Sequence, residues 1–198
     1  MHEDQTRRRF LVSGAAAATG LTLALPNLAA GQQLPLTPEC KGASDVTIRQ
    51  TEGPFFKPSS PKRADLREPA LKGELIVISG LVLTRGCKPV ANALVDLWHA
   101  DGNGDYDNKG FRGRGHQFTD GEGRYNFITV RPARYPGRTP HYHVKVQAAN
   151  RPVLTTQLYF ADDPGNARDP IFRKELLMRY VGDRTPPVAR FDFVLDIA

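Results

Sequence analysis

The chain has 198 residues, which is enough for one full domain and little more. With 40% hydrophobic and 24% charged residues, together with 18 Gly and 16 Pro, it has the composition of a turn-rich soluble globular protein. A collagen-like chain, a disordered chain and a small disulfide scaffold are thereby excluded. The formal net charge of +6 would suit an anionic partner, but basic residues are scattered among acidic ones, so we expect no nucleic-acid partner.

Residues 1–30 have the layout of an export signal. Three arginines at 7–9 precede an apolar stretch, 10–25, which is closed by Pro26 and a run of small residues. A membrane span needs about 20 strongly apolar residues, so we expect no stable span, with a signal anchor as the alternative. Residues 6–12 also resemble the twin-arginine signal, whose export machinery carries folded proteins, so we expect a periplasmic or extracellular protein.

The two cysteines, Cys40 and Cys87, are predicted to form a disulfide, because export would place them in an oxidising compartment. In the chain-entropy model, a bridge that closes a loop of this length contributes about 4 kcal/mol to stability. Two unpaired thiols are the alternative.

From residue 75 onward the hydrophobic pattern is typical of short β-strands separated by turns. A β-branched run covers 75–83 and ends in a turn at 85–89. Further strands are expected, in chain order, at 93–98, 117–119, 124–127, 141–146, 154–160 and 190–195. Only 170–180 has a helical pattern. This order predicts an all-β fold, a two-sheet antiparallel β-sandwich with a long N-terminal loop and one short helix.

Residues 31–74 are expected to connect the signal to the sandwich. The segment 51–56 and the prolines within 58–69 do not allow regular helix or strand. A long loop before a sandwich usually covers a face or lines a site. We therefore expect a signal at 1–30, an N-terminal extension with an entrance loop at 31–74, and the sandwich domain at 75–198.

Two histidines, His141 and His143, stand at i and i+2 where a strand is expected to start, so both imidazoles should project from one face. Imidazole is the commonest protein ligand for transition metals, so the pair is a candidate metal site. Alone, this spacing is a moderate signal, because it is also common among surface histidines. Tyr135 and Arg138, just before the pair, strengthen it.

A second polar segment carries Asp101, Asn103 and Asp105 at the spacing of the first three ligands of a calcium loop. Such a loop also needs Gly at its sixth position and an acid at its twelfth, where this chain has Tyr106 and Arg112. We therefore reject calcium. The segment is instead expected to be a Gly/Asp loop that presents a tyrosine at its tip.

Five short segments between roughly residues 46 and 160 form an ordered set. They are Glu52-Gly53-Pro54-Phe55, Leu97-Trp98-His99-Ala100 followed by Tyr106, then Tyr135, then Arg138-x-x-His141-x-His143, and Thr156-Gln157-Leu158-Tyr159-Phe160. Together they resemble the intradiol ring-cleavage dioxygenases, which include catechol 1,2-dioxygenases and protocatechuate 3,4-dioxygenases. Each segment is weakly specific alone, whereas five in this order are strongly specific.

The resemblance implies a non-haem Fe(III) cofactor held by two tyrosinates and two histidines, here Tyr106, Tyr135, His141 and His143. Phenolate is a hard anionic donor, so a pair of them favours the ferric ion. The implied substrates are O2 and a catechol-type ring, which is cleaved between its two hydroxyl-bearing carbons to give a cis,cis-muconate-type diacid.

The resemblance also implies roles for individual residues. Tyr135 would leave the metal and take up a substrate proton, and Arg138 would stabilise negative charge on the substrate. Gln157 would support both the ring and Arg138. His99 and His116 are expected not to be ligands, because one ends a strand and the other lies in an Arg/Gly loop.

Two other function classes stay open. One is an exported β-sandwich binding protein that has lost catalysis, and the other is a copper or zinc protein that uses the two histidines. The presence of all four implied ligand residues argues against a binding protein without catalysis. The paired tyrosines argue against a copper or zinc protein. At the level of single residues, Tyr106 and Tyr135 could be packed loop tyrosines, Arg138 a surface ion-pair partner and Gln157 a water-facing strand residue. Substrate identity and oligomeric state, a homo-oligomer included, are left open.

Overall fold

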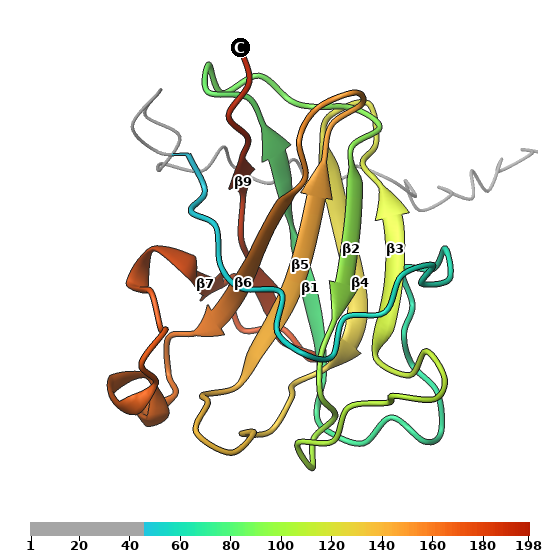
Figure 1. The fold of residues 1–198 in the computed structure, drawn as a ribbon, viewed down its shortest axis with the longest axis vertical. Helices are drawn as coiled ribbons and strands as arrows, with labels where there is room; N and C mark the ends of the chain where they lie inside the picture. The colour runs from blue at the N-terminus through green and yellow to red at the C-terminus, as the bar shows by residue number, and fades with distance from the viewer. Residues whose placement is uncertain (1–45) are drawn as a thin grey trace, which may run out of the picture. The chain divides into compact units, whose positions relative to one another are not determined.

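The computed structural model describes residues 46–198, which form a curled, mixed β-sheet with almost no helix (Figure 1). Hydrogen-bonded neighbours follow the order β3-β2-β5-β6-β7-β8-β1-β4, and β9 pairs with β1. The strands are β1 Leu75–Leu83, β2 Leu94–Trp98, β3 Arg114–Phe118, β4 Arg124–Val130, β5 His141–Gln147, β6 Leu154–Phe160, β7 Leu177–Tyr180, β8 Val188–Arg190 and β9 Phe193–Val194.

The prediction of a mostly β protein is confirmed, but the prediction of purely antiparallel sheets is wrong. β1 pairs in parallel with both β8 and β9, and β6 pairs in parallel with β7. The hydrogen-bonded path is also continuous from β6 through β7 to β8, so a division into two sheets is not confirmed. Period-2 patterning indicates which face of a strand is buried but says nothing of strand direction, which is why the sequence missed the parallel pairs.

The segment expected to be one short helix, 170–180, is different in the structure. It contains the 3-10 helix η2 Lys174–Leu176 and then strand β7, while a second 3-10 helix, η1, covers Pro164–Arg168. Leu176 is fully buried in the main core cluster. The apolar residues that suggested a helix are therefore accommodated by one 3-10 turn and a strand. Packing against the sheet overrides the local preference of this segment for a helix.

The strand expected at 190–195 is divided into β8 and β9 beside Gly80 of β1. The backbone of Phe191 passes so close that a Cβ at Gly80 would lie 1.7 Å from the Phe191 carbonyl oxygen. The carboxylate Oδ1 of Asp192 then accepts a hydrogen bond from the backbone N–H of Leu81, at 2.9 Å. This side-chain bond takes the place of a ladder bond, so the strand is interrupted at 191–192.

Replacing Gly80 by alanine is expected to destabilise the protein, because the added methyl group forces β1 away from the 191–192 backbone. Overpacking of this kind costs about 1–3 kcal/mol in the free energy of unfolding, and occasionally more. Gly121→Ala is the matched control, since nothing lies within 4 Å of its Cβ position. Urea unfolding measures both variants, and equal losses of stability would contradict the close approach at Gly80.

The core lies on one face of the central strands, and the opposite face is covered by the N-terminal segment 46–63, which crosses in front of β6, β5 and β2 in Figure 1. Its backbone is tied to the sheet by bonds such as Gln50 N to Thr155 O, at 2.9 Å, and His116 N to Pro61 O, at 3.0 Å. As expected, the whole of 46–74 holds only isolated bridges. Central strands are thus buried on both faces, which creates a water-poor layer beneath this segment.

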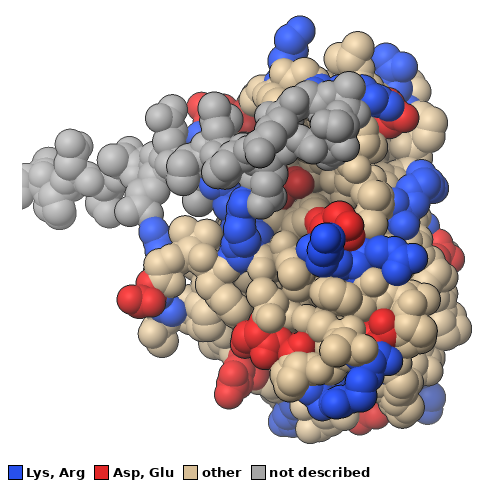
Figure 2. All heavy atoms as spheres, turned by 90° about the vertical axis from the view of Figure 1, so that its left-hand side faces the viewer, with Lys and Arg blue, Asp and Glu red and all other residues tan. Residues whose placement is uncertain are grey.

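Several sequence-based predictions fall on residues 1–45, outside the described residues: the signal at 1–30 and the cysteine Cys40. Cys87, in the turn after β1, is disulfide-bonded. Within residues 46–198, no helix is long and apolar enough to cross a membrane. Figure 2 shows one face of the molecule, on which Lys and Arg side chains are interspersed with Asp and Glu.

Candidate metal centre

Three loops extend from the end of the sheet at which β2 and β6 finish and β5 begins, the lower end in Figure 1. They cover residues 99–113 after β2, 131–140 before β5 and 161–173 after β6. Strand pairing sets which residues lie next to these loops. His143 of β5 is opposite Trp98 of β2 on one side and Gln157 of β6 on the other. The predicted site residues are therefore brought to one place by strand register and loops together.

Strand β5 presents His141 and His143 on one face, as their spacing predicts, and Tyr142 points into the core. Both imidazoles are buried, and their Nε2 atoms lie 3.1 Å apart. The Nδ1 atom of His141 lies 2.6 Å from the carbonyl oxygen of Thr139. A carbonyl only accepts, so this Nδ1 is assigned the proton, which leaves the Nε2 lone pair of a neutral ring free.

The environment keeps both histidines neutral. Burial lowers the pKa of His141 to about 4, and the positive charge of Arg138 adds to this. Burial likewise holds the pKa of His143 well below its ordinary value, with His141 contributing. Neutral imidazole is the form that ligates a metal, so both side chains are ready to bind one at neutral pH.

Tyr106 and Tyr135 lie beside the two histidines, and the four side chains form one group of rings. The ring centroid of Tyr106 lies 6.2 Å from that of Tyr135 and 6.2 Å from that of His143, and the two imidazole centroids are 4.7 Å apart. Within the described part of the chain, neither phenol oxygen has a hydrogen-bond partner. The group therefore offers four donor atoms: two phenol oxygens that lack a partner within residues 46–198, and two Nε2 atoms that contact each other.

The phenol of Tyr106 lies in surroundings that oppose its ionisation. Burial raises the pKa of Tyr106 well above its ordinary value, and the positive charges of Arg138 and Arg114 only partly counteract this. Without a further cation the side chain stays protonated at neutral pH. A metal ion bound at the phenol oxygen would supply that cation, because it favours the phenolate.

The loop that carries Tyr106 is held by its own polar residues. Asp101 Oδ1 accepts hydrogen bonds from the backbone N–H groups of Asn103, at 2.8 Å, and Asp105, at 3.1 Å. The acidic residue at the first position of the calcium-like pattern therefore stabilises the backbone of its own loop. The ring of Phe55, from the entrance loop, stacks on Tyr106 with centroids 4.3 Å apart and thereby covers it.

Arg114 joins the entrance loop to the tyrosine loop, and its position gave no signal in the sequence. Its side chain is 1% exposed, and Nη1 donates to the carbonyl oxygen of Phe55 at 2.6 Å. Nε and Nη2 donate to the carbonyl oxygen of Asp107 at 3.3 and 3.2 Å. A buried cation that satisfies two loop carbonyls fixes the positions of both loops over the tyrosine.

The imidazole of His143 is held between two neighbours. Trp98 stacks on it, with ring centroids 5.0 Å apart and planes only 8° apart. On the entrance loop, Gly53 has φ +70°, and a Cβ there would lie 3.1 Å from Cε1 of His143. Only glycine combines this backbone conformation with so close an approach at no steric cost.

The polar pair predicted beside the site, Arg138 and Gln157, forms part of a buried network. Arg138 Nη2 donates to Oε1 of Gln157 at 2.5 Å, and the hydroxyl of Tyr159 donates to the same oxygen at 2.8 Å. The amide nitrogen of Gln157 donates to the carbonyl oxygen of Thr51 at 3.0 Å. Gln157 is 0% exposed, so the alternative of a water-facing strand residue is wrong.

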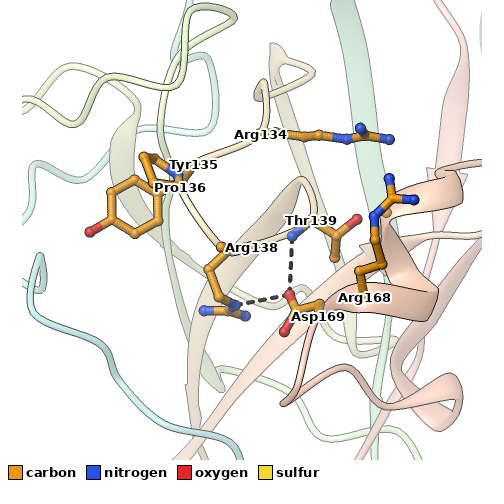
Figure 3. A pocket seen from close by; sticks show the side chains of 9 residues that line it. Arg134, Tyr135, Pro136, Arg138, Thr139, Arg168 and Asp169 are labelled. Atoms are coloured by element: carbon orange, nitrogen blue, oxygen red, sulfur yellow. Dashed lines mark hydrogen bonds and ion pairs between the residues drawn. The ribbon is translucent and has the colours of Figure 1, made fainter.

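An open cavity of about 540 Å³ lies beside this network, between the loops 131–140 and 161–173 (Figure 3). Tyr135 and Arg138 both contribute to its wall. The other three rings of the group, those of Tyr106, His141 and His143, do not line it, and neither does Gln157. A small aromatic molecule can therefore approach Tyr135 and Arg138 from solvent, whereas Tyr106 is covered by Phe55.

The remaining histidines have their own partners. His99 lies 2.7 Å from the Thr129 hydroxyl through Nε2 and 2.6 Å from the Ala100 carbonyl oxygen through Nδ1. The Nδ1 atom of His116 lies 2.8 Å from the Ser60 carbonyl oxygen. Among residues 46–198 no three His, Cys, Asp or Glu side chains are grouped so as to hold a metal. A metal at the two clustered histidines would therefore need other residue types, and the two tyrosines lie beside them.

Comparison with known proteins places this arrangement in a family. The family model described as "Dioxygenase" matches residues 51–197. The chain belongs to the intradiol ring-cleavage dioxygenases. It is 37% identical over 169 residues to the protocatechuate 3,4-dioxygenase beta chain of Burkholderia cepacia, covering 69% of this chain and 71% of that one. It is 34% identical over 149 residues to catechol 1,2-dioxygenase 2 of Acinetobacter lwoffii, covering 62% and 54%.

Solved structures agree with this assignment. The dioxygenase domain of a dioxygenase and carbohydrate-binding protein fusion from Streptomyces sp. SirexAA-E is 49% identical, with a TM-score of 0.75, and the match covers 78% of this chain and 100% of that domain. Catechol 1,2-dioxygenase from Pseudomonas arvilla C-1 is 28% identical, with a TM-score of 0.65, covering 76% and 62%. The match to the curated catechol and hydroxyquinol enzymes covers between 49% and 64% of their length. The prediction of the enzyme class is confirmed.

Proposed function

We propose that this protein is a non-haem Fe(III)-dependent intradiol dioxygenase that cleaves a catechol-type ring with O2 between its hydroxyl-bearing carbons, giving a cis,cis-muconate-type diacid. The observation that carries the proposal is the grouping of two unpartnered phenols and two neutral imidazoles beside an arginine-lined cavity. Membership of the ring-cleavage family supports the reaction class.

The donor set fits a metal ion. The two Nε2 atoms lie on one face of β5 and only 3.1 Å apart, so His141 and His143 could bind one ion together. Tyr106 and Tyr135 would supply two hard oxygen donors, a set that favours Fe(III). When bound, Fe(III) acts as a Lewis acid that lowers the pKa of the phenols and of a catechol hydroxyl.

The two tyrosines differ in their surroundings, which suggests different roles. Tyr106 stacks on Phe55 and does not line the cavity. Tyr135 lies in the cavity wall, on a loop, and is half-buried. We therefore assign Tyr135 as the residue that moves aside and takes a proton from the substrate at its phenol oxygen, while Tyr106 holds its place.

Purified protein from iron-replete cells tests the proposal. We expect about one iron per chain, a broad visible absorption from tyrosinate, and oxygen uptake with at least one of catechol, protocatechuate and hydroxyquinol. Copper or zinc in place of iron would instead favour the histidine-based alternative. A colourless, metal-free and inactive protein would favour the binding protein that has lost catalysis.

Gly53→Ala tests the contact between the entrance loop and the ligand set. The methyl group would press on His143, and we expect the variant to lose iron during dialysis against a chelator about 10–100-fold faster than the unmodified protein. Gly182→Ala is the matched control, because Gly182 also has a left-handed φ, +62°, but nothing lies within 4 Å of its Cβ position. Equal rates for the two variants would show that only backbone strain matters.

We also propose that the protein is exported to the periplasm or beyond by the twin-arginine route, on the strength of the arginine pair ahead of the apolar stretch. Replacing Arg7 and Arg8 together by lysine is expected to leave the protein in the cytoplasm. Cell fractionation followed by immunoblotting measures this. Unchanged export of the double variant would indicate another route.

A further inference from the structure

One buried carboxylate contacts the site from a loop that the sequence did not connect with it. Asp169, which follows η1, is 7% exposed as a residue and its side chain is 0% exposed. Its Oδ2 atom accepts from Arg138 Nε at 2.9 Å and from the backbone N–H of Thr139 at 3.1 Å (Figure 3). Its Oδ1 atom accepts from Ile171 N at 3.0 Å. The carboxylate thus joins the loop 161–173 to the site.

The contacts of Asp169 fix the direction of the Arg138 guanidinium. Nε is held by Asp169, and Nη2 is held by Gln157 at 2.5 Å and by the Tyr159 hydroxyl at 3.4 Å. In the described part of the chain, the Nη1 group of Arg138 has no acceptor. A planar guanidinium that is bound on two of its three nitrogens has one orientation, so its remaining donors point in a set direction.

The same carboxylate also supports a candidate ligand. Asp169 holds the N–H of Thr139, and the carbonyl oxygen of Thr139 lies 2.6 Å from Nδ1 of His141. Partners in this position set the tautomer and orientation of a ligating imidazole. The Asp169 side chain therefore holds Arg138 directly and, through Thr139, supports His141.

We propose that Asp169 is a positioning residue of this enzyme, which holds Arg138 so that Nη1 remains as the donor directed at the substrate. This rests on the proposed function. Asp169 does not touch the substrate in this assignment. It acts through Arg138, whose side chain is 16% exposed, whereas the Asp169 side chain is 0% exposed, so water screens their attraction only in part.

Asp169→Asn is the main test, since asparagine keeps the size and one acceptor oxygen but removes the charge. We expect kcat/KM for a turned-over catechol to fall about 10–100-fold, mainly through kcat, with iron content unchanged. Asp162→Asn is the matched control on the same loop, because its carboxylate pairs with Arg131 and is half exposed. That variant is expected to keep the activity of the unmodified protein.

A double-mutant cycle separates positioning from a general structural role. If Asp169 acts through Arg138, adding Asp169→Asn to Arg138→Gln should cause no further loss of kcat/KM. Losses that simply multiply would overturn the proposal. So would an Asp169→Asn variant with unchanged kcat/KM.

A crystal structure of Asp169→Asn supplies a readout that does not depend on turnover. We expect the Arg138 guanidinium to leave Oε1 of Gln157, and an unmoved guanidinium would overturn the proposal. If the unmodified protein binds iron but oxidises no catechol, the proposed function fails, whereas this structural result still reports on Asp169. The two failures are thus distinguishable.

Discussion

Replacing Tyr106 by phenylalanine is expected to weaken or shift the visible absorption, since only the Tyr135 phenolate would remain, and to reduce ring cleavage by at least about 10²-fold. The variant keeps the ring that stacks on Phe55, with centroids 4.3 Å apart, and loses only the oxygen. That oxygen has no hydrogen-bond partner among the described residues, so its removal leaves no buried polar group unsatisfied. The fold should therefore tolerate the change, while the ion loses an anionic donor.

The matched control for this change is Tyr180→Phe, because Tyr180 is 43% exposed and its hydroxyl only accepts from Arg131. Visible spectra, iron content and oxygen uptake are measured on both variants beside the unmodified protein. An unchanged visible spectrum and full activity in Tyr106→Phe would remove this tyrosine from the ligand set. Loss of both in Tyr180→Phe would point to a general defect of the preparation.

Much of the site could be predicted from the sequence because its parts depend on local spacing. His141 and His143 share a face since side chains alternate along a strand, and the structure places both imidazoles together. The motif order placed Tyr106 and Tyr135 in the same set, and the ring distances agree with that. Their roles as iron ligands stay predictions until the metal is measured.

What the sequence did not reveal depends on contacts between distant segments. Asp169 is 31 residues from Arg138, and Arg114 binds a carbonyl 59 residues away. Neither residue belongs to a motif, and an isolated Asp or Arg in a loop is usually solvated. Strand direction at the C-terminus was missed for the same reason, since β8 and β9 are placed by contacts with β1 about 110 residues earlier.

Replacing Arg138 by glutamine is expected to lower kcat by about 10²–10³-fold, the loss typical for removal of one preorganised donor to a developing negative charge. Glutamine still offers an N–H group but carries no charge and cannot contact Asp169, Gln157 and the substrate at once. Oxygen uptake under saturating catechol measures kcat. Arg131→Gln is the control, because that arginine pairs with Asp162 outside the cavity.

Arg138→Gln also carries a stability effect that must be separated from catalysis. It leaves the carboxylate of Asp169, whose side chain is 0% exposed, with only backbone donors. Breaking a buried pair from one side costs about 3–5 kcal/mol. Adding Asp169→Asn removes the isolated charge, so the double variant should regain much of the unfolding free energy while its kcat stays low. Recovery of kcat together with stability would mean that Arg138 serves the fold and not the reaction.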